Sequence, residues 1–171
     1  MAIVGSGPAA YLNGVSASNT EVAVSVATDK APTGGGITES VIGRRIIGVS
    51  DYRGKVHLLA NGTVGVALSR VSSTNVETVI KAESIVAGLS YVVGDQLRVR
   101  LQVAGTNPTT LRLRVWKLGQ SEPVTWTATA TDATATLQLP GGVGLMSYLS
   151  GSATNAPVVA RFDDLWVGWN G

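Results

Sequence analysis

Hydrophobic and polar residues alternate along most of the chain, which is the two-residue period of a strand with one buried face. Turn-forming residues separate the alternating segments from one another. The pattern predicts strands in EVAVSVA (21–27), KVHLLA (55–60), TVGVALSRV (63–71), QLRVRLQVA (96–104), TLRLRVWK (110–117), VTWTATAT (124–131) and ATATLQL (133–139). The stretch ETVIKAESIVAGL (77–89) is the best candidate for a helix, but its β-branched residues and threonine-rich flanks favour a strand.

The stretches between these segments are rich in glycine, proline and asparagine: APTGGG, ANGT, VVGD, GTNP, LGQSEP and LPGG. Asn61-Gly62 lies between two alternating segments, and this dipeptide is typical of a type I′ hairpin turn. We therefore predict an all-β protein, a two-sheet antiparallel sandwich or jelly roll with about ten to twelve short strands. A length of 171 residues fits one such domain over 1–171.

Composition narrows the classes of protein further. With 44% hydrophobic and 14% charged residues, the chain is not of the disordered, highly charged type. A net charge of +2 and an isoelectric point near 9.2 are far from the basic excess of a nucleic-acid-binding protein. The absence of cysteine excludes disulfides, cysteine-based zinc sites and thiol catalysis. No apolar run is long enough for a membrane span, and the first residues lack the pattern of a secretory signal.

Specific stretches of the chain resemble one fold family. They are APTGGG, SDYRGKVHLLANGTVGVALSRV, GDQLRVRLQVAGTNPTTLRLRVW, EPVTWTATATD and the closing PGGVGLMSYLSGSATNAPVVARFDDLWV. Over about residues 20–167 the chain resembles concanavalin A-like jelly rolls of the laminin-G and glucanase type. The version it is most similar to is an accessory domain of actinobacterial surface proteins and of phage virion proteins, in the tail or as capsid decoration. The resemblance implies a non-catalytic structural or glycan-binding module.

The N-terminal segment departs from that family pattern. The family opens with an additional tryptophan-containing segment that holds the first strands, and this chain begins after it. An uncovered sheet edge invites association with another chain. We therefore expect residues 1–19 to form an edge that a partner, either another virion protein or a copy of this chain, covers.

The two adjacent carboxylates of FDDL raise a question about the last strand. Phe162 and Leu165 are three residues apart, so strict alternation cannot bury both, and a bulge at Asp163-Asp164 would solve this. The resemblance implies calcium there, because concanavalin A-like folds often hold a structural Ca²⁺ near the last strand, and carboxylate oxygens suit that ion. The alternative is that one aspartate caps a turn or pairs with Arg161 while its neighbour faces water. No other cofactor is expected.

A glycosidase motif is missing from the sequence. Glucanases of this fold place two glutamates on one strand face, four residues apart, and a retaining mechanism needs them about 5–5.5 Å apart. The chain has five glutamates, none with a second carboxylate two or four residues away; they are Glu21, Glu39, Glu77, Glu83 and Glu122. We therefore predict that the protein is not an enzyme.

Four arginines share one face of two neighbouring predicted strands: Arg98, Arg100, Arg112 and Arg114. A hairpin centred near Asn107 would place Arg100 opposite Arg114, and like charges directly opposed destabilise a sheet. Flanking carboxylates, a bound anion or an acidic partner must offset them. This basic face could therefore be a solvated surface with acidic neighbours, or a patch for an anionic envelope glycan or a neighbouring subunit.

A sugar site needs an exposed aromatic ring, because the CH groups of the sugar stack on its face. Tyr148 and Tyr52 are candidates at loop edges, and Trp116 extends the arginine face. His57, the single histidine, is interpreted as a structural residue on a sheet face. We predict a structural or adhesion module on the surface of a phage particle, which docks to other virion proteins and can also bind a host glycan. The alternatives are a lectin-like domain of a secreted or cell-surface actinobacterial protein and, third, a degenerate glycosidase.

Overall fold

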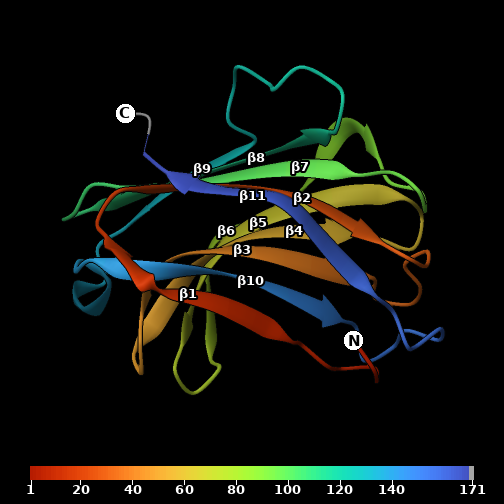
Figure 1. The fold of residues 1–171 in the computed structure, drawn as a ribbon, viewed down its shortest axis with the longest axis horizontal. Coiled ribbons are helices and arrows are strands. Elements are labelled where there is room, and N and C mark those ends of the chain that lie inside the picture. Colours follow the sequence, from red (N-terminus) through yellow and green to blue (C-terminus); the bar gives the residue numbers. More distant parts are fainter. Residues whose placement is uncertain (170–171) are drawn as a thin grey trace.

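Two antiparallel sheets, stacked face to face, make up the computed structural model, which describes residues 1–169 (Figure 1). The six-stranded sheet has the order β1 (Ala9–Ala17), β10 (Gly141–Leu149), β3 (Ile37–Ile46), β4 (Ser50–Leu58), β5 (Thr63–Ser72) and β6 (Glu77–Ser90). The five-stranded sheet has the order β11 (Ala160–Gly168), β2 (Thr20–Thr28), β7 (Leu97–Ala104), β8 (Thr109–Lys117) and β9 (Ala128–Asp132). This arrangement confirms the predicted all-β, two-sheet antiparallel jelly roll. No described helix is long and apolar enough to cross a membrane.

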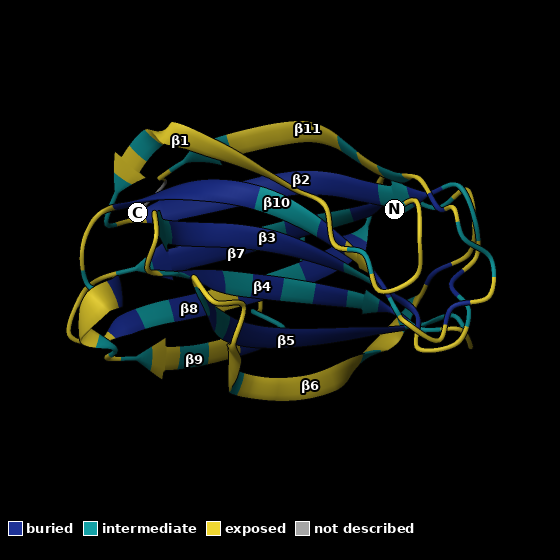
Figure 2. Ribbon diagram, turned by 90° about the horizontal axis from the view of Figure 1, so that it is seen from below, coloured by how far each residue is buried: buried dark blue, intermediate teal, exposed yellow. Residues whose placement is uncertain are grey.

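The core lies between the two sheets and is filled by every second residue of the central strands. In β7, Arg98 and Arg100 point outward, while four residues with no exposed surface point into the core: Leu97, Val99, Leu101 and Val103. Burial of each such side chain contributes about 1.5–3 kcal/mol. The central strands are buried along most of their length, whereas β1, β6 and β11 are exposed edges (Figure 2).

Most of the predicted strands are present, with two errors between residues 124 and 139. The stretch 77–89 forms strand β6 rather than a helix. Of the segment 124–131, only the residues from Ala128 onward form a strand, β9. The segment 133–139 is not a strand: it contains the short 3-10 helix η1 (Ala135–Leu137). The physical reason is that the side chain of Asp132 accepts a 2.8 Å hydrogen bond from the backbone N–H of Thr134, which turns the chain at the end of β9.

The β4–β5 hairpin is where the sequence placed it, but its turn is of another type. Gly62 N–H donates to the carbonyl of Leu59 (2.9 Å), and Leu59 N–H donates to the carbonyl of Thr63 (3.0 Å). The loop therefore has three residues, of which only Gly62 has a positive φ, at 82°. A type I′ turn needs a positive φ at both central residues. Instead, the Asn61 side chain accepts hydrogen bonds from the N–H and hydroxyl of Thr63.

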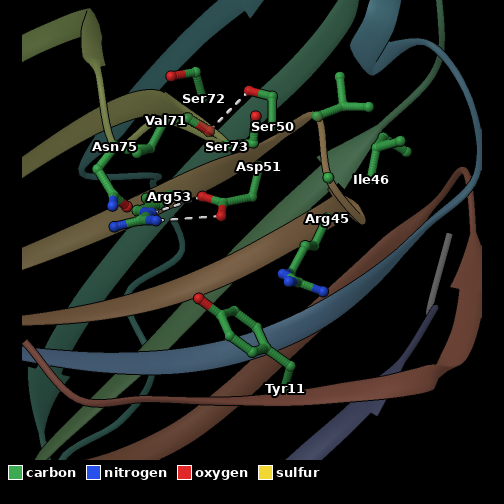
Figure 3. A pocket seen from close by; sticks show the side chains of 12 residues that line it. Tyr11, Arg45, Ile46, Ser50, Asp51, Arg53, Val71, Ser72, Ser73 and Asn75 are labelled. Carbon is green, nitrogen blue, oxygen red and sulfur yellow. Dashed lines mark hydrogen bonds and ion pairs between the residues drawn. The ribbon is translucent and has the colours of Figure 1, made fainter.

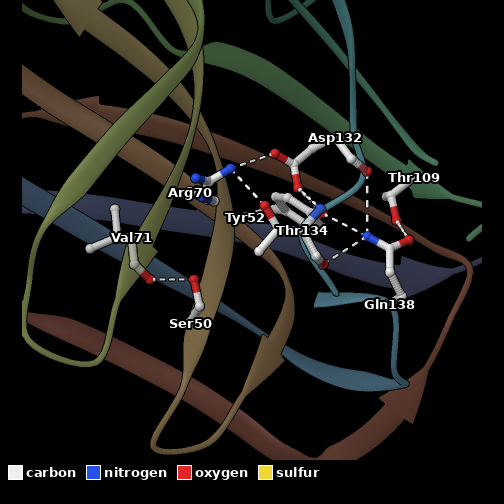
Figure 4. A network of polar contacts seen from close by, with 8 residues as sticks. All are labelled: Ser50, Tyr52, Arg70, Val71, Thr109, Asp132, Thr134 and Gln138. Atoms are coloured by element: carbon white, nitrogen blue, oxygen red, sulfur yellow. Dashed lines mark hydrogen bonds and ion pairs between the residues drawn. The ribbon is translucent and has the colours of Figure 1, made fainter. Parts of the chain in front are cut away.

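Tyr52 lies in the core and not at a loop edge, so the prediction that it contacts a ligand is wrong. It occupies an inward position of β4 and has no exposed surface. Its hydroxyl donates to Asp132 (2.9 Å), which also accepts a 2.7 Å bond from Arg70, and Gln138 completes the network (Figure 4). Burial, together with the Asp132 carboxylate, raises the pKa of Tyr52 to about 12. The network anchors the end of β9 and η1 to the six-stranded sheet.

A carboxyl group is also buried between the sheets. Glu39 occupies a core-facing position of β3 between Ile37 and Val41 and is 2% exposed. The hydroxyl of Ser147 on β10 donates to one of its oxygens, and the other oxygen has no partner. Burial raises the pKa of Glu39 to about 7. The folded protein therefore holds a proton on Glu39 at pH values where the unfolded chain has lost it.

Replacing Glu39 should change how stability depends on pH. The contribution of a protonated Glu39 is fully present below pH 4.5, its ordinary pKa, and is lost as the pH rises through about 7. We expect Glu39→Gln to gain stability relative to the native protein between these pH values, by on the order of 3 kcal/mol. Urea denaturation from pH 4 to pH 8 measures the difference. Asp163→Asn, at an exposed aspartate, is the control; parallel curves for the native protein and Glu39→Gln would contradict the expectation.

Candidate ligand-binding groove

A groove of about 650 Å³ lies on the outer face of the six-stranded sheet. It exists because the residues of β4 that alternate with the core residues are polar and point away from the core. Strand β10 supplies the opposite wall, and the N-terminal segment around Gly5 and Gly7 borders it. The side chains that matter most for its chemistry are Arg53, Lys55, His57, Glu77, Met146 and Tyr148.

Each cation that lines the groove has an acidic partner. Lys55 pairs with Glu77 on β6 (2.8 Å), and Arg53 pairs with Asp51 on its own strand (2.6 Å). Although burial acts in the opposite direction, the hydrogen bonds from Lys55 hold the pKa of Glu77 below its ordinary value. The groove is thus rich in charged hydrogen-bonding groups whose charges cancel in pairs.

His57 is held from both sides at one end of the groove. Its Nδ1 lies 2.9 Å from a carboxylate oxygen of Glu83, and its Nε2 lies 2.7 Å from the carbonyl oxygen of Gly35. The Glu83 side chain folds over Gly65, where a Cβ atom would lie 2.9 Å from its carboxyl carbon. The placement agrees with the interpretation of His57 as a residue on a sheet face, now within the groove.

Tyr148 is the exposed aromatic residue of the groove. It lies on β10 beside Thr38 of β3, is 40% exposed, and lines the cavity with Met146, whose sulfur accepts a hydrogen bond from Arg53. A Cβ atom at Gly7 would lie 3.4 Å from its ring. The sequence placed Tyr148 near a loop edge; the structure places it on a strand that forms the wall of the groove.

The predicted arginine face is the outer surface of the five-stranded sheet, on the opposite side of the molecule. Arg100 does pair with Arg114 across β7 and β8, as expected from the hairpin. Carboxylates offset them: Glu122 lies 2.6 Å from Arg100 and 2.7 Å from Arg114, and Glu21 of β2 lies 2.9 Å from Arg100. Arg114 also stacks 4.0 Å from the ring of Trp126. The acidic neighbours of the first alternative are present at this central pair, and binding of an anionic glycan or a subunit by this face stays a prediction.

The remaining residues of that face have neutral partners. Arg98 donates to the carbonyl of Asp164, and Arg112 donates to the side chain of Gln102. Trp116 is on the predicted face, opposite Arg98, but it is only 8% exposed. Such a ring offers a ligand little surface, so the structure does not support Trp116 as a stacking platform.

The bulge predicted in FDDL is present. The register of β11 against β2 shifts between Asp163 and Trp166, and Asp164 has a φ of 51°. The Asp163 side chain accepts a 2.8 Å hydrogen bond from the N–H of Asp164. Phe162 packs against the core, but Leu165 is 43% exposed, so the expectation that the bulge buries both side chains is wrong.

The bulge offers few ligands for a calcium ion. Among the described residues, no group of three carboxylate or histidine side chains is placed to hold a metal. The guanidinium of Arg98 lies 2.8 Å from the carbonyl oxygen of Asp164, where it opposes a second cation. Calcium takes six to eight oxygen ligands. Calcium binding at Asp163 and Asp164 stays a prediction, and it needs further ligands from solvent or from another chain.

Most of the groove residues escaped the sequence analysis. The signal was the polar half of the alternation in DYRGKVH (51–57), which sends Asp51, Arg53, Lys55 and His57 to one face. The strand predicted over 55–60 contains only Lys55 and His57 of this set, and its polar side was not interpreted as a site. The pairing with Glu77 and Glu83 could not be found from spacing, because these residues lie on β6, two strands away.

Comparisons with known proteins support the fold. No family model matches the chain, and no curated protein matches its sequence. The chain is similar in structure to the carbohydrate-binding module CBM66 from Bacillus subtilis (14% identity, TM-score 0.58, 96% of each chain covered). It is also similar to a legume lectin-like domain from Entamoeba histolytica (10% identity, TM-score 0.59, 100% of this chain and 82% of that chain). A third similar structure is the CBM2 module of the evolved Dit protein of Lactobacillus casei BL23 phage J-1 (10% identity, TM-score 0.54, 95% of this chain and 68% of that chain covered).

The same fold also occurs in hydrolases. Scytalido-glutamic peptidase is similar at 10% identity and a TM-score of 0.54, over 95% of this chain and 79% of that chain. A part of a xylan β-1,4-xylosidase from Bacillus halodurans is similar at 12% identity and a TM-score of 0.53, over 88% of this chain and 28% of that chain. At these identities the likeness establishes the jelly-roll architecture. It does not decide between binding and catalysis, because one fold hosts many functions.

The role of Glu122 can be measured by stability. Removing its charge leaves Arg100 and Arg114 opposed without the carboxylate that bridges them. We expect Glu122→Gln to lose about 1 kcal/mol of unfolding free energy at low salt, and less at high salt. In a background that already carries Arg114→Gln the loss should shrink, because the like-charge pair is gone. Equal losses in both backgrounds, measured by urea denaturation, would contradict the bridging role.

Proposed function

We propose that this protein is a non-catalytic glycan-binding module and that the sugar lies in the groove of the six-stranded sheet. The observation that carries the proposal is the exposed ring of Tyr148 beside charged groups that are neutralised in pairs. A sugar is amphipathic in the same way: its CH face stacks on an aromatic ring, and its hydroxyls bond to polar groups around it. A cavity of this size is in the range of ligand sites.

The paired carboxylates favour binding over hydrolysis. A glycosidase needs one carboxyl group as acid and a second as nucleophile or base, both free to act on the sugar. In and beside this groove, Asp51, Glu77 and Glu83 each contact a basic side chain within 3 Å. In a binding module such ion pairs serve as fixed donors and acceptors, because each pair can accept and donate hydrogen bonds to neighbouring hydroxyls.

Substitutions at Tyr148 test the proposal. We expect Tyr148→Ala to weaken binding at least about tenfold, because the stacking surface is lost, while Tyr148→Phe keeps most of the affinity. The measurement is binding of the isolated protein to an array of bacterial envelope and plant polysaccharides, followed by calorimetric titration of each glycan that binds. Val124→Ala, at a side chain 94% exposed in the loop beside the other sheet, is the control.

Two further outcomes of that titration are informative. Binding that is equal for the native protein and Tyr148→Ala would place the sugar elsewhere, and no binding to any glycan would overturn the proposal. Repeating the titration with calcium and then with EDTA tests the predicted metal: loss of binding in EDTA that Asp163→Asn reproduces would support a calcium ion at the bulge.

A docking role in a phage particle is the second candidate function. The side of the sandwich between the edge strands β1 and β11 favours it. Two mainly apolar pockets, of about 430 and 90 Å³, lie between β1, β10 and β11. Leu12 of β1 and Leu165 of β11 border this side and are 45% and 43% exposed. Exposed apolar surface next to two free strand edges is typical of an association site. Its occupant would be another virion protein or a copy of this chain, on a capsid or tail; a bacterial cell surface is the alternative location.

Association through this side can be tested on the isolated protein. If copies of the chain dock here, its mass in solution should rise with concentration, and a Leu12→Glu, Leu165→Glu variant should stay monomeric because charges would be buried at the contact. Light scattering after size exclusion measures the mass. Leu118→Glu, at a leucine 46% exposed outside this side, should behave as the native protein. A native protein that is monomeric at all concentrations would rule out self-association.

A further inference from the structure

A second pocket, of about 200 Å³, continues the groove at one end. The two cavities share Arg53, Val71 and Asn75 in their lining, so a ligand in the groove can extend into the end pocket. Tyr11 of β1 and Arg45 of β3 form one side, and the turn between β5 and β6 lies across from them (Figure 3). The end pocket thus lies where a bound chain of sugars would pass from β10 toward the β5–β6 turn.

Arg45 differs from the other cations of the groove. Its guanidinium lies 3.8 Å from the centre of the Tyr11 ring and donates one 2.9 Å hydrogen bond, to the side chain of Asn13. Among the described residues, no carboxylate pairs with it. A guanidinium carries five N–H donors, so most of those of Arg45 have no acceptor among residues 1–169. Tyr11 and Asn13 hold the group in place, which reduces the entropy lost when a ligand binds.

The end pocket carries a net positive charge. Two guanidinium groups line it, those of Arg45 and Arg53, and Asp51 is the one carboxylate in its lining. Asp51 contacts Arg53 with both of its oxygens, at 2.6 and 3.2 Å, and so does not offset Arg45. The rest of the groove is neutral in pairs, so this charge is local.

We propose that the end pocket is a subsite for the carboxylate of an acidic sugar unit, such as a uronic acid. A guanidinium binds a carboxylate through two parallel N–H···O bonds. A neutral sugar has no carboxylate to accept this pair of bonds, and the ammonium group of a lysine does not have the planar pair of donors that makes them. Ser73 and Asn75 line the same pocket and supply further polar groups to the ring hydroxyls. This inference rests on the proposed glycan binding in the groove and adds the class of glycan that it selects: one that carries carboxylates.

The test uses small probes, so that it does not depend on knowing the polysaccharide. D-Glucuronate and D-galacturonate are titrated into ¹⁵N-labelled protein next to the neutral sugars D-glucose and D-galactose and next to acetate. We expect saturable NMR shifts of the Arg45 Nε–H and of neighbouring amides with both uronates. The neutral sugars should bind at least about tenfold more weakly than the uronates, because they lack the carboxylate. Acetate should bind about fivefold more weakly, because it lacks the sugar ring and its hydroxyls.

Variants locate the effect. Arg45→Gln should raise the dissociation constant for the uronates about tenfold and leave that for the neutral sugars within about twofold. Arg112→Gln is the matched control, because Arg112 also lacks a carboxylate partner but lies on the opposite sheet, bonded to Gln102. Uronate binding should weaken in 300 mM salt, as expected of a charge contact near the surface.

Failure of this inference is distinguishable from failure of the proposed function. Two results would overturn the subsite for an acidic sugar: equal affinity for uronates and neutral sugars, or an equal loss of affinity for both in Arg45→Gln. Glycan binding that depends on Tyr148 would not be affected by either result. Acetate that binds as tightly as the uronates would also overturn the subsite, because the pocket would then recognise a carboxylate without the sugar. The Tyr148 variants on the glycan array decide the function separately.

Discussion

The two-residue period of β4 is the constraint on which both the core and the groove depend. Its inward residues, Tyr52 and Val56 among them, fill the space between the sheets, and its outward residues, Arg53, Lys55 and His57, form the floor of the groove. A slip of one residue in the pairing with β3 or β5 would exchange the two sets. The hydrophobic core therefore fixes the register, and the register places the polar groups of the candidate site.

Polar groups inside the sandwich are tolerated where they fasten its ends. Arg44 is fully buried, burial lowers its pKa, and its guanidinium donates to the Thr109 hydroxyl and to three carbonyls, those of Ser18, Gly105 and Leu137. The three carbonyls come from three separate connections between strands, so one side chain joins these connections at one end of the sandwich. Each of the two groups keeps one atom without a partner, the Nε of Arg44 and one oxygen of Glu39, and burial raises the pKa of Glu39 to about 7.

Carboxylates offset the cations of the groove floor and the central arginine pair of the other face, whereas Arg98 and Arg112 of that face have neutral partners. On the five-stranded sheet, Glu122 and Glu21 offset the opposed arginines, and on the six-stranded sheet each cation of the groove floor has its own acid. Neutral pairing avoids like-charge repulsion across strands and still leaves many hydrogen-bonding groups exposed. Arg45, held over Tyr11, is the half-buried cation of the groove region that the described acids do not match. Because of this local excess of positive charge, we propose that the end pocket binds an anionic group of the ligand.

The sequence alone determined the fold class, strands β2 and β4 to β8, the β7–β8 register that opposes Arg100 and Arg114, and the bulge at Asp163-Asp164, because alternation, turn residues and a broken period are local properties. The type of the Asn61-Gly62 turn, the 3-10 helix after Asp132 and the burial of Tyr52 depended on contacts with other strands. The groove was decided only in the tertiary structure. It joins β4, β6 and β10, which lie far apart in the chain, and no spacing in the sequence records which strands become neighbours in a sheet.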